Sequence, residues 1–216
     1  KTKFNWSGTM IGAYHKDNMI TGDTLASGQT IIALKENGFR CNGISATRAA
    51  LRKKFGDRWG ENPNAKESIR VAATPSVLYD PFINTLHGWF GKDFKPEIAI
   101  HAVVHLSGGA FKEKLAKDIL FPRRLSAELD NLWEPPQIMR QCAEWRGIND
   151  EEFYEVWNGG QGMLLVVEEK DTEYCIKRAK DFGIDAKISG RIIKESTSRV
   201  SIISQLTQGK IIEYKS

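Results

Sequence analysis

The sequence predicts an α+β fold in which helices flank a mixed β-sheet. Short apolar runs that are typical of strands alternate with segments of helical spacing, but without the strict strand–helix–strand repeat of a parallel sheet. The chain has 216 residues, 41% of them hydrophobic and 10% aromatic, which is enough to build a hydrophobic core for one domain or one and a half.

The N-terminal residues resemble the end of another domain. Phe4–Lys16 (FNWSGTMIGAYHK) is an apolar segment typical of a strand, but it has no local hairpin partner. Because an unpartnered strand leaves its backbone groups unpaired, we interpret it as the last strand of an upstream domain. Residues 17–28 are polar and rich in turn-forming residues, which is typical of a linker. We therefore expect residues 1–25 to end one domain and residues 26–216 to form the next.

Seven further segments are predicted to be strands. Thr30–Leu34 and Met163–Val167 are unbroken apolar runs, which are typical of strands buried on both faces, whereas Arg124–Leu129 alternates as a half-buried strand does. In chain order the predicted strands are Thr30–Leu34, Ile98–Val104, Arg124–Leu129, Met163–Val167, Ile184–Ile193, Val200–Ile203 and Ile211–Tyr214.

Capping and breaker residues mark the predicted helices. Ser45 stands near the cap of the first helix, and Thr74 precedes Pro75 as a cap would, although Pro81 is expected to kink that helix or delay its start. Residues 56–68, between these two helices, are predicted to be a surface loop. The predicted helices are Ile44–Phe55, one starting at Thr74-Pro75, Phe111–Leu120, one from Pro135-Pro136 to Trp145 that Gly147 ends, a short turn at Asp150–Tyr154, and one that Asp171 or Thr172 caps and Gly183 ends.

Charge and cysteine content argue against several classes of function. The net charge is +4 and the calculated pI is about 8.9, but the Lys and Arg residues are interspersed with acidic ones, which does not indicate nucleic-acid binding. A mildly basic surface suits a small anionic ligand. No apolar run approaches the roughly 20 residues of a membrane span. Cys41, Cys142 and Cys175 lack metal-ligand spacing, so we expect a reducing, cytoplasmic location and no metal site.

The stretch His105-Leu106-Ser107-Gly108-Gly109-Ala110-Phe111 is the most informative motif. A strand that ends in a glycine turn and opens a helix leaves backbone N–H groups facing outward, which favours phosphate or carboxylate binding. His105 is the best candidate for a general acid–base because its ordinary pKa is near neutral. The alternatives are a plain strand-to-helix turn and a histidine that bonds a neighbouring carbonyl.

Two other glycine loops have similar neighbours, namely residues 38–43 and residues 157–163. If the strands share a sheet, the three loops meet at one edge, where small-molecule clefts are most often found. Arg40 would pair with a phosphate, and Asn42 and Asn158 would offer fixed donors and acceptors. The alternative is that each glycine serves a turn and each asparagine caps it locally. The sequence shows no Walker-type loop, no Ser-His-Asp order and no carboxylate cage for magnesium.

Taken together, these segments resemble the aminoimidazole ribonucleotide (AIR) synthetase family, also called phosphoribosylformylglycinamidine cyclo-ligase. The resemblance covers nearly the whole chain, in order and spacing, and corresponds to the C-terminal domain. It implies a three-layer α/β/α fold with a mixed sheet, and Phe4–Lys16 would be the last strand of the N-terminal ATP-binding domain. The segments that carry it are Gly38–Gly43, Pro75–Tyr79, the His105–Phe111 stretch, Trp133-Glu134-Pro135-Pro136 and Asn158–Met163.

The resemblance also implies a function. Such enzymes use ATP and magnesium to close formylglycinamidine ribonucleotide to aminoimidazole ribonucleotide in purine biosynthesis, and they are cytoplasmic homodimers built mainly through the N-terminal domains. The ATP and metal groups lie largely on that N-terminal half, so this chain alone would be inactive and would hold no metal. His105 would be catalytic, and the substrate would be bound by Arg40, Asn42, Gly43, Ser107, Gly108, Gly109 and Asn158.

Three departures from the family pattern leave other functions open. Arg40-Cys41 stand where the family has His-Ser, Gly108-Gly109-Ala110 replace three glycines, and Pro75-Ser76-Val77 replace Pro-Thr-Arg. An arginine stays charged and does not transfer protons as histidine does. The alternatives are a non-catalytic module that binds a phosphoribosyl ligand, and another member of the same ATP-dependent superfamily with a different substrate.

Overall fold

The computed structural model describes residues 7–41 and 43–216. Strands and helices follow one another in the mixed order expected from the sequence. The strands are β1 (Thr30–Lys35), β2 (Ile100–His105), β3 (Ser126–Leu129), β4 (Gln161–Val167), β5 (Ala186–Ile193), β6 (Arg199–Ile203) and β7 (Ile211–Lys215). The helices are α1 (Ile44–Phe55), α2 (Lys66–Ala72), α3 (Asp80–Leu86), η4 (Ala110–Leu120), α4 (Gln137–Arg146), α5 (Asp150–Val156) and α6 (Thr172–Asp181), with short 3₁₀ turns between some of them.

The seven strands form one mixed sheet in the order β2-β4-β1-β5-β3-β6-β7. Among the strands that the structure describes, β3 and β6 pair in parallel, and the other five pairs are antiparallel. Along the β1–β4 pair the register runs from Thr30 opposite Val167 to Lys35 opposite Gln161. The end of β1 therefore lies beside the start of β4, and this pairing brings two of the glycine loops to the same edge of the sheet.

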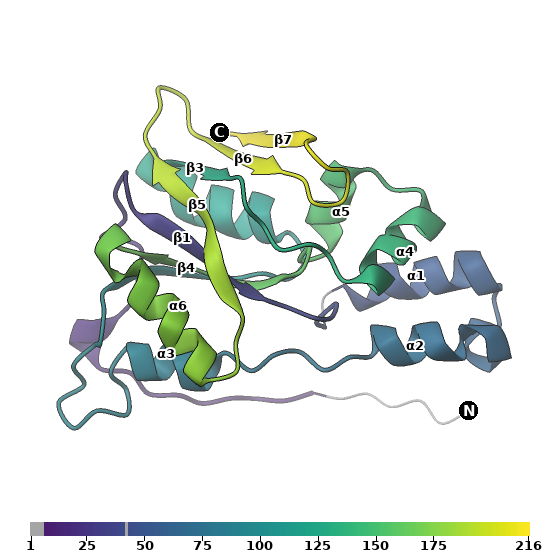
Figure 1. The fold of residues 1–216 in the computed structure, drawn as a ribbon, viewed down its shortest axis with the longest axis horizontal. Coiled ribbons are helices and arrows are strands. Elements are labelled where there is room, and N and C mark those ends of the chain that lie inside the picture. Colours follow the sequence, from purple (N-terminus) through teal and green to yellow (C-terminus); the bar gives the residue numbers. More distant parts are fainter. Residues whose placement is uncertain (1–6, 42) are drawn as a thin grey trace.

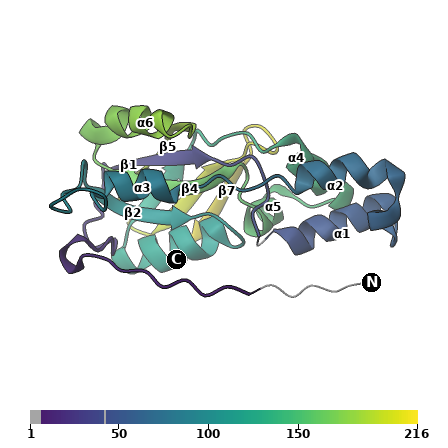
Figure 2. The same cartoon turned by 90° about the horizontal axis from the view of Figure 1, so that it is seen from below.

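Helices cover both faces of the sheet, which confirms the predicted three-layer arrangement. In Figure 1, α3 and α6 lie on one face, and Figure 2 shows the teal helix η4 on the opposite face, with α1, α2 and α4 extending from one end. Two separate cores fill the layers. Ile32, Leu34 and Leu165 contribute to the core under α3 and α6, whereas Ile31 and Leu164 contribute to the core under η4.

The central strands are buried on both faces, and this explains their unbroken apolar sequences. In β1, Ile31 and Ala33 face one core while Ile32 and Leu34 face the other, each with no exposed surface. Successive side chains of a strand point to opposite faces, so a strand with helices on both sides needs apolar residues at every position.

The helix predicted to start at Thr74-Pro75 begins instead at Asp80. Thr74 donates its hydroxyl to Val71 O at 2.7 Å, which closes the end of α2 and caps no new helix. Pro81 lies in the first turn of α3, where a proline's missing N–H is tolerated. Of the two expectations for Pro81, the delayed start is therefore confirmed.

Of two smaller predictions about helix α1 and its surroundings, one is confirmed and one is wrong. Gly43 is the cap residue of α1, so Ser45 lies near the cap as expected. The loop predicted at residues 56–68 contains two 3₁₀ turns and the start of α2. Asn62 caps the second turn by accepting from the N–H of Asn64 at 2.9 Å. A polar residue that is typical of loops thus starts a local helical turn.

The strand predicted at Phe4–Lys16 is not found in its described part. Residues 7–15 have no regular secondary structure and are exposed to solvent, while residues 4–6 lie outside the described residues. A strand is stable only when its backbone groups pair with a neighbour, and no described strand of the sheet pairs with this segment. Assignment of residues 1–25 to an upstream domain stays a prediction.

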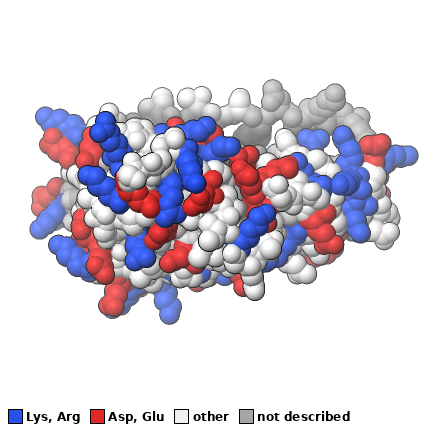
Figure 3. Space-filling model, turned by 90° about the horizontal axis from the view of Figure 1, so that it is seen from above, with Lys and Arg blue, Asp and Glu red and all other residues white. Residues whose placement is uncertain are grey.

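Charged side chains of both signs intermingle on the surface. On the face in Figure 3, Lys and Arg residues alternate with Asp and Glu residues, without a broad region of one sign. This distribution agrees with the interspersed charges of the sequence.

Candidate functional site

The three glycine loops meet at one edge of the sheet. The side-chain amide of Asn158 donates to Gly38 O at 2.9 Å, and the N–H of Leu106 donates to Gly162 O at 3.1 Å. These bonds tie the loop after β1 to the loop before β4, and the start of the loop after β2 to the first residues of β4. The convergence expected from the sequence is therefore present, and it builds one continuous wall.

Asn158 holds this wall together from inside. It is fully buried, and while its amide N–H donates to Gly38, its Oδ1 accepts from the N–H of Gly160 at 2.8 Å. Both ends of the side chain are thus engaged in the loops. This is the local structural role that the sequence left open beside ligand binding.

Gly43 is required by close packing. Its carbonyl accepts a hydrogen bond from the Trp157 indole at 3.2 Å, and a Cβ at this position would lie 2.5 Å from Cδ1 of the same ring. Any side chain would therefore push the first and third loops apart. The neighbouring Asn42, which we predicted to bind substrate, lies outside the described residues.

Arg40 is held by a buried acidic residue that sequence reasoning missed. Its guanidinium donates to Glu36 Oε2 at 2.7 Å, and the Glu36 side chain is completely buried. Arg40 also lies over the ring of Tyr79, 5.5 Å from the ring centre, and has a left-handed backbone with φ of 58°. A left-handed conformation is unfavourable for a residue with a Cβ, so the surrounding contacts must hold it.

Tyr79 completes this buried cluster. Its hydroxyl donates to Lys35 O at 2.6 Å and lies 3.3 Å from Glu36 Oε2. Burial, and then the Glu36 carboxylate, raise the pKa of Tyr79 far above its ordinary value. The phenol therefore stays protonated and serves as a donor. A lone Glu after a strand and a Tyr in a coil carry no recognisable motif, and their meeting depends on the fold.

His105 is exposed at the end of β2, beside Met163 of β4. Partial burial and the positive charges of Arg40 and Lys114 lower the pKa of His105. The imidazole is therefore neutral at physiological pH and is able to accept a proton. The structure thus brings His105 and Arg40 within electrostatic reach of one another, and it adds Lys114, which the sequence analysis did not single out.

The glycine turn after β2 differs from the expected anion site in one respect. The N–H of Gly109, which has a φ of 70°, donates to Glu155 O at 2.7 Å, and the N–H of Ala110 donates to Ser107 O at 3.1 Å. These two groups do not face outward, so the positive character of the turn comes from side chains. Ser107 is buried and its Oγ accepts from Lys114 Nζ, while Gly108 is half-buried.

A cavity of about 320 Å³ lies against Arg40. Arg40 and Val77 both line it, although they come from separate segments of the chain. The other residues that line it are Leu78, Tyr79, Asp80, Ile83, Asn84, Val103 and Met163.

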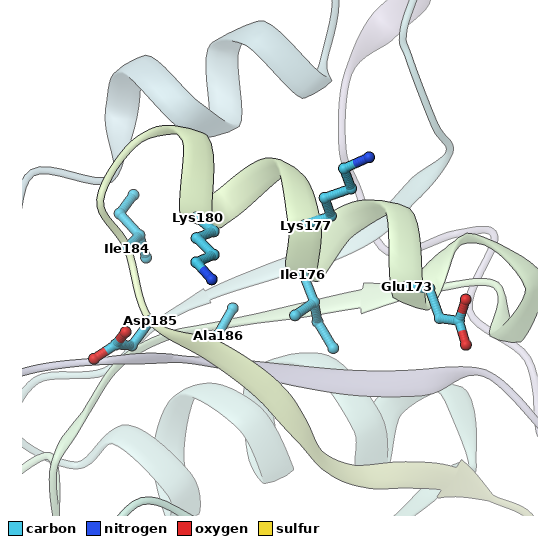
Figure 4. A pocket seen from close by; sticks show the side chains of 7 residues that line it. All are labelled: Glu173, Ile176, Lys177, Lys180, Ile184, Asp185 and Ala186. Carbon is cyan, nitrogen blue, oxygen red and sulfur yellow. The ribbon is translucent and has the colours of Figure 1, made fainter.

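A larger cavity lies away from the glycine loops. It has a volume of about 470 Å³ and lies between α6 and the start of β5, where Ile176 points from the helix toward the sheet (Figure 4). Lys177, Lys180 and Asp185 are among the charged residues that line it. Because none of the glycine-loop residues lines it, the smaller cavity beside Arg40 is the one relevant to the candidate site.

Within residues 7–41 and 43–216, no three His, Cys, Asp or Glu side chains gather in a way that would hold a metal ion. We therefore assign no step of a reaction to a metal held by these residues alone. In the same part of the chain, no helix is both long and apolar enough to span a membrane.

The fold and this edge of the sheet define a three-layer α/β/α domain with glycine loops that meet at one site. Residues 26–203 match the family described as "AIR synthase related protein, C-terminal domain", and the chain belongs to this family.

Comparison with known proteins gives distant relatives. The chain is 28% identical over 195 residues to the phosphoribosylformylglycinamidine cyclo-ligase of Staphylococcus carnosus (strain TM300), covering 90% of this chain and 54% of that protein. It is 26% identical over 202 residues to the protein of the same name from Staphylococcus aureus (strain JH9), covering 93% and 56%. The chain thus spans about half the length of the curated relatives it matches.

Among solved structures, E. coli HypE, a hydrogenase maturation protein, aligns with a TM-score of 0.51 and 17% identity. The alignment covers 92% of this chain and 52% of that one. At this identity the likeness concerns the fold alone, and it agrees with the predicted fold class.

Proposed function

We propose that this chain is the C-terminal part of an ATP-dependent cyclo-ligase that closes formylglycinamidine ribonucleotide to aminoimidazole ribonucleotide. The observation that carries the proposal is the joining of the three glycine loops at one edge of the sheet, with Arg40 on the first loop and His105 at the start of the second. The names of the curated relatives supply the reaction class. In the longer protein, ATP would activate the formyl oxygen of the substrate, and the amidine nitrogen would close the ring with release of ADP and phosphate.

In this proposal the residues of the chain bind the substrate and move a proton. Arg40 pairs with Glu36 through Nη1, and it lines the cavity of about 320 Å³. An arginine with a donor still available suits a substrate phosphate. His105 is neutral and exposed, so its imidazole would accept the proton that the amidine nitrogen loses as the ring closes.

The test is turnover by the full-length protein with His105→Ala. General acid–base groups contribute about a hundredfold to ten-thousandfold to rate, so we expect a loss of that order in kcat. His87→Ala is the matched control, because His87 lies at the end of α3 outside the loops. Unchanged turnover in His105→Ala would remove His105 from the mechanism.

A second proposal is a module that binds the ribonucleotide without catalysis. It is favoured by Arg40-Cys41 at the position where the family has His-Ser, since arginine does not replace histidine in proton transfer. Full-length protein that binds formylglycinamidine ribonucleotide but forms no ADP would support this alternative. Formation of ADP with another substrate would instead support a different member of the superfamily.

A further inference from the structure

Lys114 reaches back from helix η4 onto the loop that precedes it. Its ammonium donates to Ser107 Oγ and to His105 O at 3.3 Å. The backbone N–H of Lys114 bonds to Gly109 O at 3.4 Å, five residues earlier, as the wide winding of a π-helix requires. Lys114 is therefore tied to the loop through both its backbone and its side chain.

Three basic side chains from separate segments lie at this edge of the sheet. Lys114 contacts His105 and Ser107, and Arg40 lines a cavity together with Met163, the β4 partner of His105. Arg40 comes from the loop after β1, His105 from the end of β2 and Lys114 from η4. Burial and the charge of Arg40 lower the pKa of Lys114, and partial burial, Arg40 and Lys114 lower the pKa of His105. His105 thus senses both cations, and Lys114 senses the charge of Arg40.

Acidic residues also lie near these cations, and Asp80 lines the same cavity as Arg40. Glu36 pairs with Arg40, and Asp118 on η4 is the acidic group that acts on Lys114. Glu36 also bonds Tyr79, so its carboxylate is shared. Like charges held close together repel, and a bound anion would relieve that repulsion.

We propose that Arg40, His105 and Lys114 form a three-sided binding site for a phosphate monoester, with Lys114 as its third ligand. This deepens the proposed function, on which it rests for the phosphorylated character of the ligand. A planar guanidinium offers paired donors to phosphate and an ammonium supplies a point charge, while the imidazole gains a proton as the dianion binds. Binding of a dianion is then coupled to protonation of His105.

Two measurements on the protein test this site without any turnover. The first is the pKa of His105 from NMR titration, with its signal assigned by its loss in His105→Asn. Sulfate is the probe, because it does not titrate where histidine does. We expect sulfate to raise the pKa of His105 in the unaltered protein, and an unchanged pKa would overturn the proposal.

The second measurement is the affinity for inorganic phosphate. We expect Lys114→Met to bind phosphate about tenfold more weakly and to have a higher pKa of His105 in the absence of anion. Lys114→Arg keeps the charge and should bind nearly as the unaltered protein does. The control is Lys117→Met, since Lys117 is exposed on the same helix and pairs with Glu113 at 2.9 Å.

If Lys114→Met binds phosphate as tightly as the unaltered protein does, the role of Lys114 is refuted. The same holds if Lys117→Met loses as much phosphate affinity as Lys114→Met. If Lys114→Met does not fold, the sulfate titration of the unaltered protein still decides. Neither readout involves ATP or ring closure. If the full-length protein binds phosphate in this way but forms no product, the proposed function is refuted and the binding site is not.

Discussion

Arg40 donates a 2.7 Å hydrogen bond to a Glu36 carboxylate that has no exposed side-chain surface. The two residues are four positions apart, but they lie in a loop and not in a helix, and the left-handed backbone of Arg40 turns its side chain toward Glu36. This ion pair connects the end of β1 to the candidate anion site.

The pair should be strongly coupled. We expect Arg40→Met to destabilise the fold by about 3 kcal/mol, because it leaves a buried carboxylate without its partner. Glu36→Gln should also destabilise the fold. The double variant should lose clearly less unfolding free energy than the sum of the losses in the two single variants. Denaturant unfolding of the four proteins measures this coupling. Additive losses would show that Glu36 and Arg40 act independently.

The shared cavity of Arg40 and Val77 predicts a rescue. The N–H of Val77 lies 3.4 Å from Glu36 Oε1, so a guanidinium introduced at position 77 would lie close to the same carboxylate. We expect Arg40→His to lower the Tm and weaken phosphate binding, and Arg40→His combined with Val77→Arg to restore part of both. Arg40→His with Leu78→Arg is the control, because Leu78 is 76% exposed. If Leu78→Arg rescues Arg40→His as well as Val77→Arg does, the rescue is a general effect of added charge.

Gly162 has a packing requirement of its own. A Cβ there would overlap the hydroxyl and ring of Tyr79, which is held by Lys35 and Glu36. We expect Gly162→Ala to destabilise by about 1–3 kcal/mol, the range of overpacked cores. Gly60→Ala, whose Cβ meets nothing within 4 Å, should leave the unfolding free energy nearly unchanged. Thermal unfolding compares the two, and equal stability would contradict the close approach of Tyr79.

Asp150 should make the stability of the fold depend on pH. Burial alone would raise the pKa of its carboxyl, but hydrogen bonds from Ser204, Thr207 and Lys210 outweigh burial and hold the pKa below its ordinary value. The stabilisation is therefore complete above the ordinary pKa of an aspartate, and it is lost as pH falls through the lower folded pKa.

We expect Asp150→Asn to destabilise by about 1–3 kcal/mol at neutral pH, as for other buried groups that lose a hydrogen-bond partner. The difference from the unaltered protein should shrink below about pH 4. Urea unfolding at several pH values checks this. Asp57→Asn is the control, because the Asp57 side chain is 94% exposed. A difference that stayed constant with pH would exclude the carboxylate as its source.

Sequence patterns located most elements because their signals are local. Thr30–Lys35 and Gln161–Val167 form strands where unbroken apolar runs predicted them, and Gly147 ends α4 with a φ of 70° as a C-terminal glycine does. Thr74 was misread because a threonine before a proline has the same local pattern whether it starts a helix or closes the previous one. Here the end of α2 accepts the hydrogen bond of Thr74, so the threonine closes that helix.

The candidate site was only partly predictable. Glycine loops after strands indicated the edge of the sheet, and the structure joins these loops there. The roles of His105 and Arg40 stay a prediction. Glu36, Tyr79 and Lys114 were missed because each is an ordinary residue in its own segment. Their relation to Arg40 arises from pairing between strands and packing of a helix on a loop.

The sequence by itself determined the mixed order of strands and helices, the loops that carry glycine, and membership of a family, because these depend on local spacing and composition. Only the tertiary structure decided which of the loop residues brace the wall and which face one another as charges. Asn158 is turned inward by its bonds to Gly38 and Gly160, whereas Lys114 is brought to His105 and Ser107. Hydrogen bonding and electrostatics act over distances in space, and residues far apart in the chain become neighbours only when the sheet closes.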